Sequence, residues 1–437
     1  MAQAAPTDQS PLPAEPTAEQ GDRWTPRLGW MIGFLTVIST FNYLDRSLLG
    51  LLLPLIKADL HLSDTALGLI SGLAFAIFYS TLGIPIAGLA DRYSRRNIIA
   101  IGFGFWSLMT ALTAYVSSGI QMAFCRFLMG AGEAAGLAPS QSMIADSFSR
   151  ARRPLALAIL TTASAIDALI FLPLAAWAAD LYGWRVAFEV AGLGGFLLAI
   201  LFYFTVREPD RVSGPVTAAN KVPLGEAIIV LWRSPAFRVI MIGVSFMGGA
   251  LYATGTWTTA LLTRVHGLSI TEIGVIVTPL RGVIGIVGIM ATGWLTDRLG
   301  RRDPRWRFRV PAIASIILAP AYVMMLLSDT PAIWIAGLGI TAAFYASFQG
   351  PIFAATMALA PDRMKTVAVA INIFFTGLVG QVLGPLIVGA LNDYLAPTYG
   401  EHAIRYSMLA VAVCSALGGL CFLWAGRLAQ NESERAV

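Results

Sequence analysis

The chain has 437 residues, of which 57% are hydrophobic and only 13% are charged, and its net charge is +5. A soluble protein of this size carries about a quarter charged residues, so the composition excludes an ordinary soluble protein. Long apolar runs recur from residue 29 to residue 427. Each bilayer crossing needs about 20 such residues, and its backbone polar groups must be satisfied internally. The predicted fold class is therefore an all-α integral membrane protein.

The first 28 residues are rich in Pro, Ala, Gln and acidic residues. They lack the basic start and apolar core of a signal peptide, so we interpret 1–28 as a disordered cytoplasmic tail. The three cysteines lie in apolar runs and predict neither a disulfide framework nor a metal site.

Twelve apolar segments then follow, and we expect each to be a transmembrane helix. A longer polar segment, 206–236, separates six from six as a cytoplasmic linker, and its second half predicts a helix on the membrane surface. The sequence predicts two six-helix halves, 29–205 and 237–427, and a cytoplasmic tail at 428–437. The predicted helices lie near residues 29–56, 65–89, 97–118, 120–146, 154–179, 186–205, 237–262, 272–296, 309–328, 331–358, 366–392 and 403–427.

Basic residues predict the orientation of the chain. If both termini are cytoplasmic, most Lys and Arg residues fall on cytoplasmic segments, as the positive-inside rule requires. The outer loops then hold only Lys57, Arg185, Arg264 and Arg405. We expect a multi-pass protein of the cell inner membrane, whose basic charge faces anionic lipids rather than nucleic acid.

A loop motif occurs twice. AGLADRYSRR ends the second segment and GWLTDRLGRR ends the eighth, at an offset of 206 residues. This spacing indicates an internal duplication, and two related halves with a site between them are typical of secondary transporters. We predict a gating role for the paired residues Asp91, Arg92, Arg95 and Arg96 in the first copy and Asp297, Arg298, Arg301 and Arg302 in the second.

These motifs resemble the major facilitator superfamily, and RFLMGAGEAA (126–135) resembles its helix-4 motif. NYLDR (42–46) together with GAGEAA looks most like the spinster-like group, whose animal members are associated with lysophospholipid and sphingolipid export. The resemblance implies alternating access and an amphipathic anionic, lysolipid- or sphingolipid-like substrate. NY-x-DR also occurs in bacterial organic-anion symporters, so a sugar-acid or carboxylate symporter remains the alternative, and a channel is a more distant one.

Charged residues inside the spans are expensive and usually functional. A partly dry carboxyl beside an arginine changes its proton affinity when a cavity opens or closes, so we predict proton coupling at Asp45 and Glu133. The alternative to a functional role is a structural one, in which these charged residues form a buried network that only holds the first half together. We expect Arg46 and Arg126 to meet the substrate anion. The further predicted substrate-binding residues are Tyr43, Tyr79, Gln349 and Asn372.

The fifth segment departs from the resemblance, because it has no glycine and carries Asp167. Counting residues along the fifth and eighth segments places Asp167 and Arg281 at similar depths. We predict that they pair across the two halves when the outer side is closed. The chain has no phosphate-binding Gly-Lys loop, and its three histidines stand singly. We therefore expect no enzyme activity, cofactor or metal, and a monomer whose partners are the substrate, protons and membrane lipids.

Overall fold

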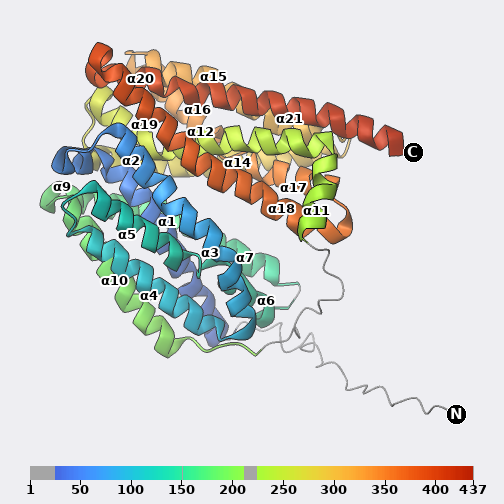
Figure 1. The fold of residues 1–437 in the computed structure, drawn as a ribbon, viewed down its shortest axis with the longest axis horizontal. Coiled ribbons are helices and arrows are strands. Elements are labelled where there is room, and N and C mark those ends of the chain that lie inside the picture. The colour runs from blue at the N-terminus through green and yellow to red at the C-terminus, as the bar shows by residue number, and fades with distance from the viewer. Residues whose placement is uncertain (1–24, 150, 211–223, 437) are drawn as a thin grey trace.

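The computed structural model describes residues 25–149, 151–210 and 224–436, and in these ranges the chain forms helices and no strands. The helices pack as two groups (Figure 1). The first group comprises α1 (Pro26–Leu60), α2 (Asp64–Ser71), α3 (Leu73–Arg92), α4 (Arg95–Thr113), α5 (Gly119–Glu133), α6 (Leu137–Ser147), α7 (Arg153–Thr161), α8 (Ala163–Ile166), the π-helical η1 (Asp167–Phe171), α9 (Leu172–Tyr182) and α10 (Trp184–Thr205).

The second group follows α11 (Leu224–Arg233), the helix expected in the linker. It comprises α12 (Pro235–His266), α13 (Ile270–Glu272), the π-helical η3 (Ile273–Val277), α14 (Thr278–Gly300), α15 (Trp306–Leu327), α16 (Pro331–Phe344), α17 (Gln349–Leu359), the short η4 (Asp362–Met364), α18 (Lys365–Phe374), the π-helical η5 (Phe375–Val379), α19 (Gly380–Tyr399), the short η6 (Gly400–His402), α20 (Ala403–Ser407) and α21 (Leu409–Ala436).

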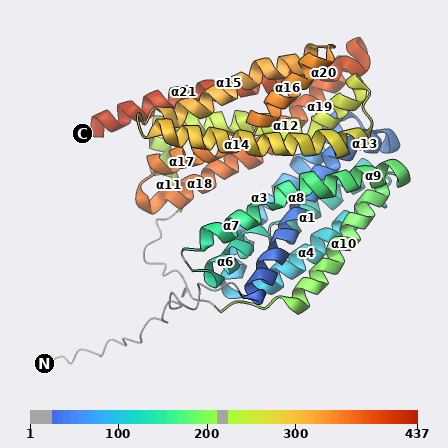
Figure 2. The ribbon, with the colours of Figure 1, turned by 180° about the vertical axis from the view of Figure 1, so that it is seen from behind.

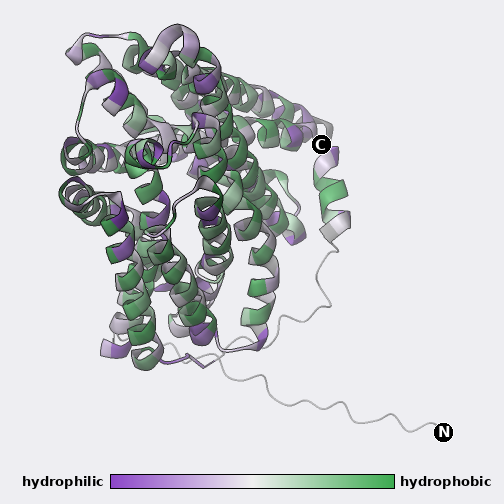
Figure 3. Ribbon diagram, turned by 60° about the vertical axis from the view of Figure 1, so that its left-hand side comes forward, coloured by the Kyte–Doolittle hydropathy of each residue, from purple (hydrophilic) through white to green (hydrophobic). Residues whose placement is uncertain are grey.

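Apolar residues dominate the long helices, and polar residues gather at their ends and in the connections (Figure 3). Each of the twelve predicted ranges overlaps helix. Eight helical stretches among the described residues are long and apolar enough to cross a membrane. They are 64–90, 153–182, 184–205, 235–266, 270–300, 306–327, 331–359 and 365–432.

The helices differ from the predicted segments at several ends and breaks. Pro26 begins α1 after Thr25, whose side chain accepts a hydrogen bond from the Leu28 backbone, so the helix starts inside the predicted tail. The fourth-segment helix breaks after Glu133 and the tenth breaks after Phe344, at corresponding places in the two groups. The predicted C-terminal tail is helical to Ala436. Residues 1–24, 211–223 and 437 lie outside the described part of the chain.

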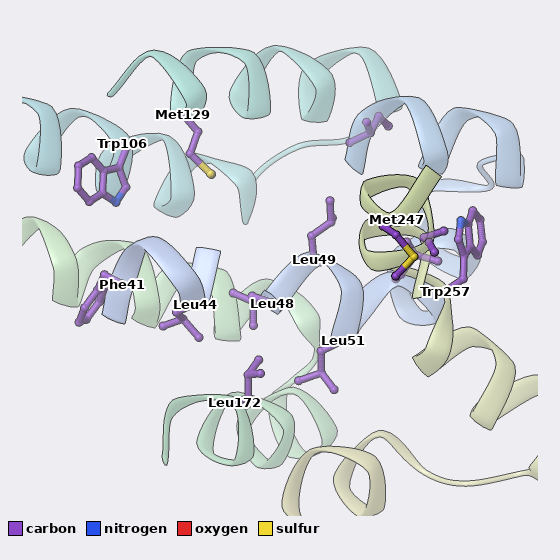
Figure 4. Close-up of a cluster of buried hydrophobic side chains, with 14 of the residues drawn as sticks. Phe41, Leu44, Leu48, Leu49, Leu51, Trp106, Met129, Leu172, Met247 and Trp257 are labelled. Atoms are coloured by element: carbon purple, nitrogen blue, oxygen red, sulfur yellow. The ribbon is translucent and has the colours of Figure 1, made fainter. Parts of the chain in front are cut away.

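The core is built around α1. Its residues Leu48, Leu52 and Leu53 are fully buried. Figure 4 shows the α1 leucines between Trp106 and Met129 of the first group and Met247 and Trp257 of α12. Because α1 is packed on several sides, its acidic residue Asp45 is buried within the protein.

The two groups touch at one end and spread at the other. At the far end, α2 packs on α19, the end of α1 packs on α12, and α9 packs on α13 and η3. Figures 1 and 2 show α6 and α7 diverging from α17 and α18 at the opposite end, which we name the linker end because α11 lies there. The structure is therefore closed at the far end.

Candidate functional site

Glu133 and Arg46 form the centre of a buried polar network. Glu133 is fully buried at the end of α5. Its Oε2 accepts hydrogen bonds from Arg46 Nη2 at 2.8 Å, from Arg46 Nε at 3.0 Å and from Asn42 Nδ2 at 2.7 Å. Asn42 and Arg46 are one turn apart on α1, so a single face of that helix meets the carboxylate. The ion pair thus joins the first and fourth predicted segments.

Two aromatic rings flank the Arg46 guanidinium. Its central carbon lies 4.8 Å from the ring centroid of Phe75 and 4.6 Å from that of Tyr79, and the rings stack on one another. These distances are typical of cation–π contacts. The Arg46 side chain is still 25% exposed, whereas Glu133 has no exposure. The Arg46 guanidinium therefore packs against aromatic rings and remains exposed enough for an anion to reach it.

Asp45 points away from Arg46, as expected for adjacent residues on a helix. Its Oδ1 accepts a hydrogen bond from Thr110 Oγ1 of α4 at 2.9 Å. Arg126 Nη1 donates to the Asp45 backbone carbonyl at 2.9 Å, and the Arg126 side chain is fully buried. The structure therefore assembles the four charged residues predicted in the first half, but Arg126 contacts the protein interior rather than an exposed surface.

Asp167 opens the π-helical segment η1 and is 3% exposed. Its Oδ2 lies 2.9 Å from Ser47 Oγ. The depth estimate agrees with the packing, because a Cβ built on Gly282 would lie 3.2 Å from Ala168 Cβ. Among the described residues, however, no ion pair joins Asp167 to Arg281, and Arg281 Nε has no hydrogen-bond partner. The predicted pair is not formed here, although the far end is closed.

The predicted binding residues separate into two kinds. Tyr43 is 44% exposed, and Tyr79 and Gln349 are partly exposed. Asn372 is fully buried, and its Nδ2 donates to Thr356 Oγ1 at 2.8 Å. Asn372 thus joins α18 to α17 inside the second group, away from any exposed surface.

The predicted gating residues also have different surroundings. Arg95 is 2% exposed and bonds Asp146 of α6 and Glu208, which follows the end of α10. It therefore ties helices of one group together. The other gating residues described are at least partly exposed at the linker end: Arg92, Arg96, Asp297, Arg298, Arg301 and Arg302. The side chain of Asp91 lies outside the described part.

An ion-pair latch at the far end was not predicted. Asp64 of α2, whose side chain is 4% exposed, accepts two hydrogen bonds from Arg264 of α12, at 2.7 and 2.9 Å. Lys57 lies 2.8 Å from the same carboxylate. A second contact has its acid on the other group. Asp393 of α19 accepts hydrogen bonds from the backbone N–H groups of Asp64 and Thr65 at the start of α2, at 3.0 and 2.8 Å. The Asp64–Arg264 pair, which we call the latch, joins the two groups.

Close backbone approach accompanies the latch. A Cβ built on Gly68 would lie 2.6 Å from the Pro385 carbonyl oxygen, and one on Gly50 would lie 2.7 Å from that of Gly255. Real Cβ atoms do not approach so closely, so larger residues would separate α2 from α19 and α1 from α12. The fifth segment, which lacks glycine, packs on glycines of the eighth segment. A Cβ built on Gly274 would overlap the Cβ of Ala176.

No group of three or more His, Cys, Asp or Glu side chains in the described ranges is arranged to hold a metal ion. The network offers a reachable guanidinium, a carboxyl that neutralises it and two further buried carboxyls. Such an arrangement can bind an anion and exchange protons.

The family pattern of the Major Facilitator Superfamily matches residues 35–385. The chain is 33% identical to an MFS-type efflux pump of Mycolicibacterium smegmatis, over 92% of this chain and 94% of the pump. It is 26% identical to protein spinster homolog 1 of Xenopus tropicalis (92% and 81% covered) and 24% identical to a hexuronate transporter of Bacillus subtilis (93% and 98% covered).

A crystal structure of a bacterial homologue of the human lysosomal transporter Spinster, inward-facing and unoccupied, has the same fold. The TM-score is 0.83 at 23% identity, covering 94% of this chain and 99% of that one. The two copies of the loop motif, the arrangement of the helices and these matches all point to the same family. The chain belongs to the Major Facilitator Superfamily, resembles its spinster-like members, and is a membrane transporter rather than an enzyme.

Proposed function

We propose that this transporter is proton-coupled and moves an amphipathic anion by alternating access. The observation that carries the proposal is the environment of Arg46, a partly exposed guanidinium beside two stacked aromatic rings that is neutralised by one fully buried carboxylate. A buried charge left without a partner is strongly unfavourable. Arg46 is therefore paired with Glu133 when no substrate is present.

The geometry links anion binding to proton binding. A substrate anion at Arg46 competes with Glu133 for the same guanidinium nitrogens. Protonation of Glu133 removes its charge and frees Arg46 for the anion, so anion and proton bind to the same state of the protein. Asp45 responds to this exchange through its charge, because it is adjacent to Arg46 on α1 and buried.

The rings favour a substrate with an apolar part next to its anionic group. Tyr79, which is partly exposed, lies against Arg46, and Tyr43 is exposed one turn before it, whereas Phe75 is fully buried behind Arg46. A lysolipid- or sphingolipid-like anion fits this chemistry, and a spinster homologue is among the relatives. A sugar acid is the second candidate, because a guanidinium fork binds a carboxylate equally well and a hexuronate transporter is also a relative.

The topology proposed is twelve transmembrane helices in two six-helix halves, with the linker end and both termini in the cytoplasm of a cell with an inner membrane. The basic linker-end residues support this orientation. Asp91 and Asp297 would then contact the opposite half only when the linker end closes. Gln349 remains a proposed contact for the substrate on the second half.

The test is transport into proteoliposomes under an imposed pH gradient, with a lysophospholipid and a hexuronate as separate substrates. Glu133→Gln and Asp45→Asn should abolish gradient-driven transport while leaving folding near normal. Glu189→Gln is the matched control, since Glu189 contacts the exposed Tyr115 hydroxyl, far from Arg46. If both single variants still respond fully to the gradient, the proton sites are assigned wrongly; transport of hexuronate alone would favour the sugar-acid alternative.

A further inference from the structure

The buried network contains one more acid than base. Asp45, Glu133 and Asp167 are each no more than 3% exposed in the first group. Two guanidinium groups contact residues of this network: Arg46 pairs with Glu133, and Arg126 donates to the Asp45 backbone carbonyl. With every group ionised the network would carry a net negative charge inside the membrane, where an uncompensated charge is costly. Arg281 is a further cation at this depth, but among the described residues no ion pair joins it to any of the three acids, so a proton on one carboxyl can compensate the excess charge.

Contacts with cations distinguish the three acids. Glu133 accepts two hydrogen bonds from Arg46, and Asp45 accepts one from Thr110 while Arg126 donates to its backbone carbonyl. Asp167 forms no ion pair among the described residues, and its Oδ1 has no hydrogen-bond partner. Asp167 is therefore the acid whose negative charge the structure compensates least.

The charged groups around Asp167 are few. The helix α1, which packs on η1, contributes Asp45 and Arg46, and Arg46 is engaged by Glu133. The helix α14 contributes Arg281, which is level with Asp167 but not paired with it. The adjoining α8 has no charged residue, and α9 carries only Asp180, exposed near the far end. A proton is thus the available compensation for Asp167.

The hydrogen bonds of Ser47 point the same way. Ser47 Oγ lies 2.8 Å from the Tyr43 carbonyl oxygen and 2.9 Å from Asp167 Oδ2. A serine hydroxyl has one proton to donate but can also accept. Both contacts are full hydrogen bonds only if Asp167 is the donor to Ser47 and Ser47 donates to the carbonyl.

We infer that Asp167, through its hydrogen bond to Ser47, is a third proton-binding site of the transporter and holds the excess proton when the far end is closed. Ser47 follows Arg46 directly on α1. Loss of the proton from Asp167 would place a negative charge beside Arg46 and weaken its hold on a substrate anion.

This inference rests on the proposed proton-coupled function, but infrared spectroscopy can test it without substrate. The whole protein in lipid nanodiscs at neutral pH gives a difference spectrum between wild type and Asp167→Asn. A protonated acid at this position predicts the loss of one carboxylic C=O band, which shifts in D₂O. Loss of a carboxylate band instead would show that Asp167 is ionised and overturn the inference.

Two further variants complete the test. Asp180→Asn is the matched control, because it removes an exposed acid from the same segment and should leave the carboxylic band in place. Ser47→Ala removes the acceptor, so the Asp167 band should shift to higher frequency without vanishing. If Asp167→Asn does not fold, this shift decides the matter, and an unchanged band in Ser47→Ala would reject the assignment.

Transport provides the link to function. In proteoliposomes Asp167→Asn should retain substrate exchange but lose gradient-driven accumulation, so that the inside-to-outside ratio falls to one. Accumulation equal to that of Asp180→Asn would remove Asp167 from the coupling. A wild-type protein that ignores the pH gradient would refute the proposed function, while the infrared result would still decide the protonation of Asp167.

Discussion

Replacing Arg264 by glutamine should open the far end of the molecule. Arg264 is the second group's contribution to the latch, and it gives two hydrogen bonds to Asp64 at 2.7 and 2.9 Å. Its longer contact with Glu401, at 3.7 Å, involves a carboxylate that is 75% exposed and should contribute little. The substitution therefore removes mainly the bonds that join α2 to α12.

The magnitude follows from what remains after the substitution. Hydrogen bonds to charged groups contribute about 1.5–3 kcal/mol each. Lys57 stays 2.8 Å from Asp64, so the carboxylate is not left alone, and we take the low end, about 2 kcal/mol for the whole change. Since 1.4 kcal/mol corresponds to a factor of ten, the population open at the far end should rise about 30-fold.

Cysteine accessibility measures this population. Leu386→Cys, in a protein whose three native cysteines are replaced, places a thiol where α19 meets Gly68 of α2. Its rate of reaction with a membrane-impermeant maleimide should rise about 30-fold with Arg264→Gln. Lys57→Gln is the control, because it also removes an ion pair from Asp64 but within one group. Equal labelling rates in the two variants would refute the idea that Arg264 holds the groups together.

Three further outcomes can be measured. Although burial raises the pKa of Glu208, hydrogen bonds from the Arg96 backbone and the Arg95 and Ser94 side chains hold it below its usual value. Its stabilisation is present above the unfolded-state pKa, about 4.3, and is lost as the pH falls through the folded value. Glu208→Gln should thus lower stability by about 1 kcal/mol at pH 7, and a melting-temperature difference that does not shrink as the pH is lowered would contradict this. Asp297→Asn should raise maleimide labelling of linker-end cysteines, and unchanged labelling would count against gating. Gly274→Leu should slow transport by separating α9 from η3, and wild-type rates would show that this contact is not required.

The sequence predicted the charged site because its signal is local. Acids and bases inside apolar segments stand out, and helix geometry places Arg126 and Glu133 two turns apart on one face. The structure brings both to α1, where Asp45 and Arg46 point to different partners. The similar depths of Asp167 and Arg281 were also predictable, because counting residues gives the position of a side chain along a helix.

The same reasoning could not give contacts that depend on rotation or on conformation. Depth alone does not tell which way Arg281 points, and Asp167 bonds Ser47 instead. Asn372 was expected to face the substrate because it is a buried amide, but Thr356 satisfies it inside the second group. The latch was missed because Asp64 and Arg264 lie in predicted outer loops, where charged residues are ordinary, and 200 positions separate them.

The packing of Ala176 on Gly274 has a consequence for how the protein can vary. The spacing between the helices at this contact depends on the combined volume of the two side chains. Glycine is therefore needed at one of the two positions, but not at a particular one. Ala168 of the fifth segment similarly packs with its methyl group against Gly282 of the eighth segment. Exchanging the residues of such a pair, so that the glycine moves to the fifth segment, conserves volume, whereas alanine on both sides does not. Single substitutions here should look harmful while reciprocal ones look silent, so the interface can drift in sequence without ever changing its spacing.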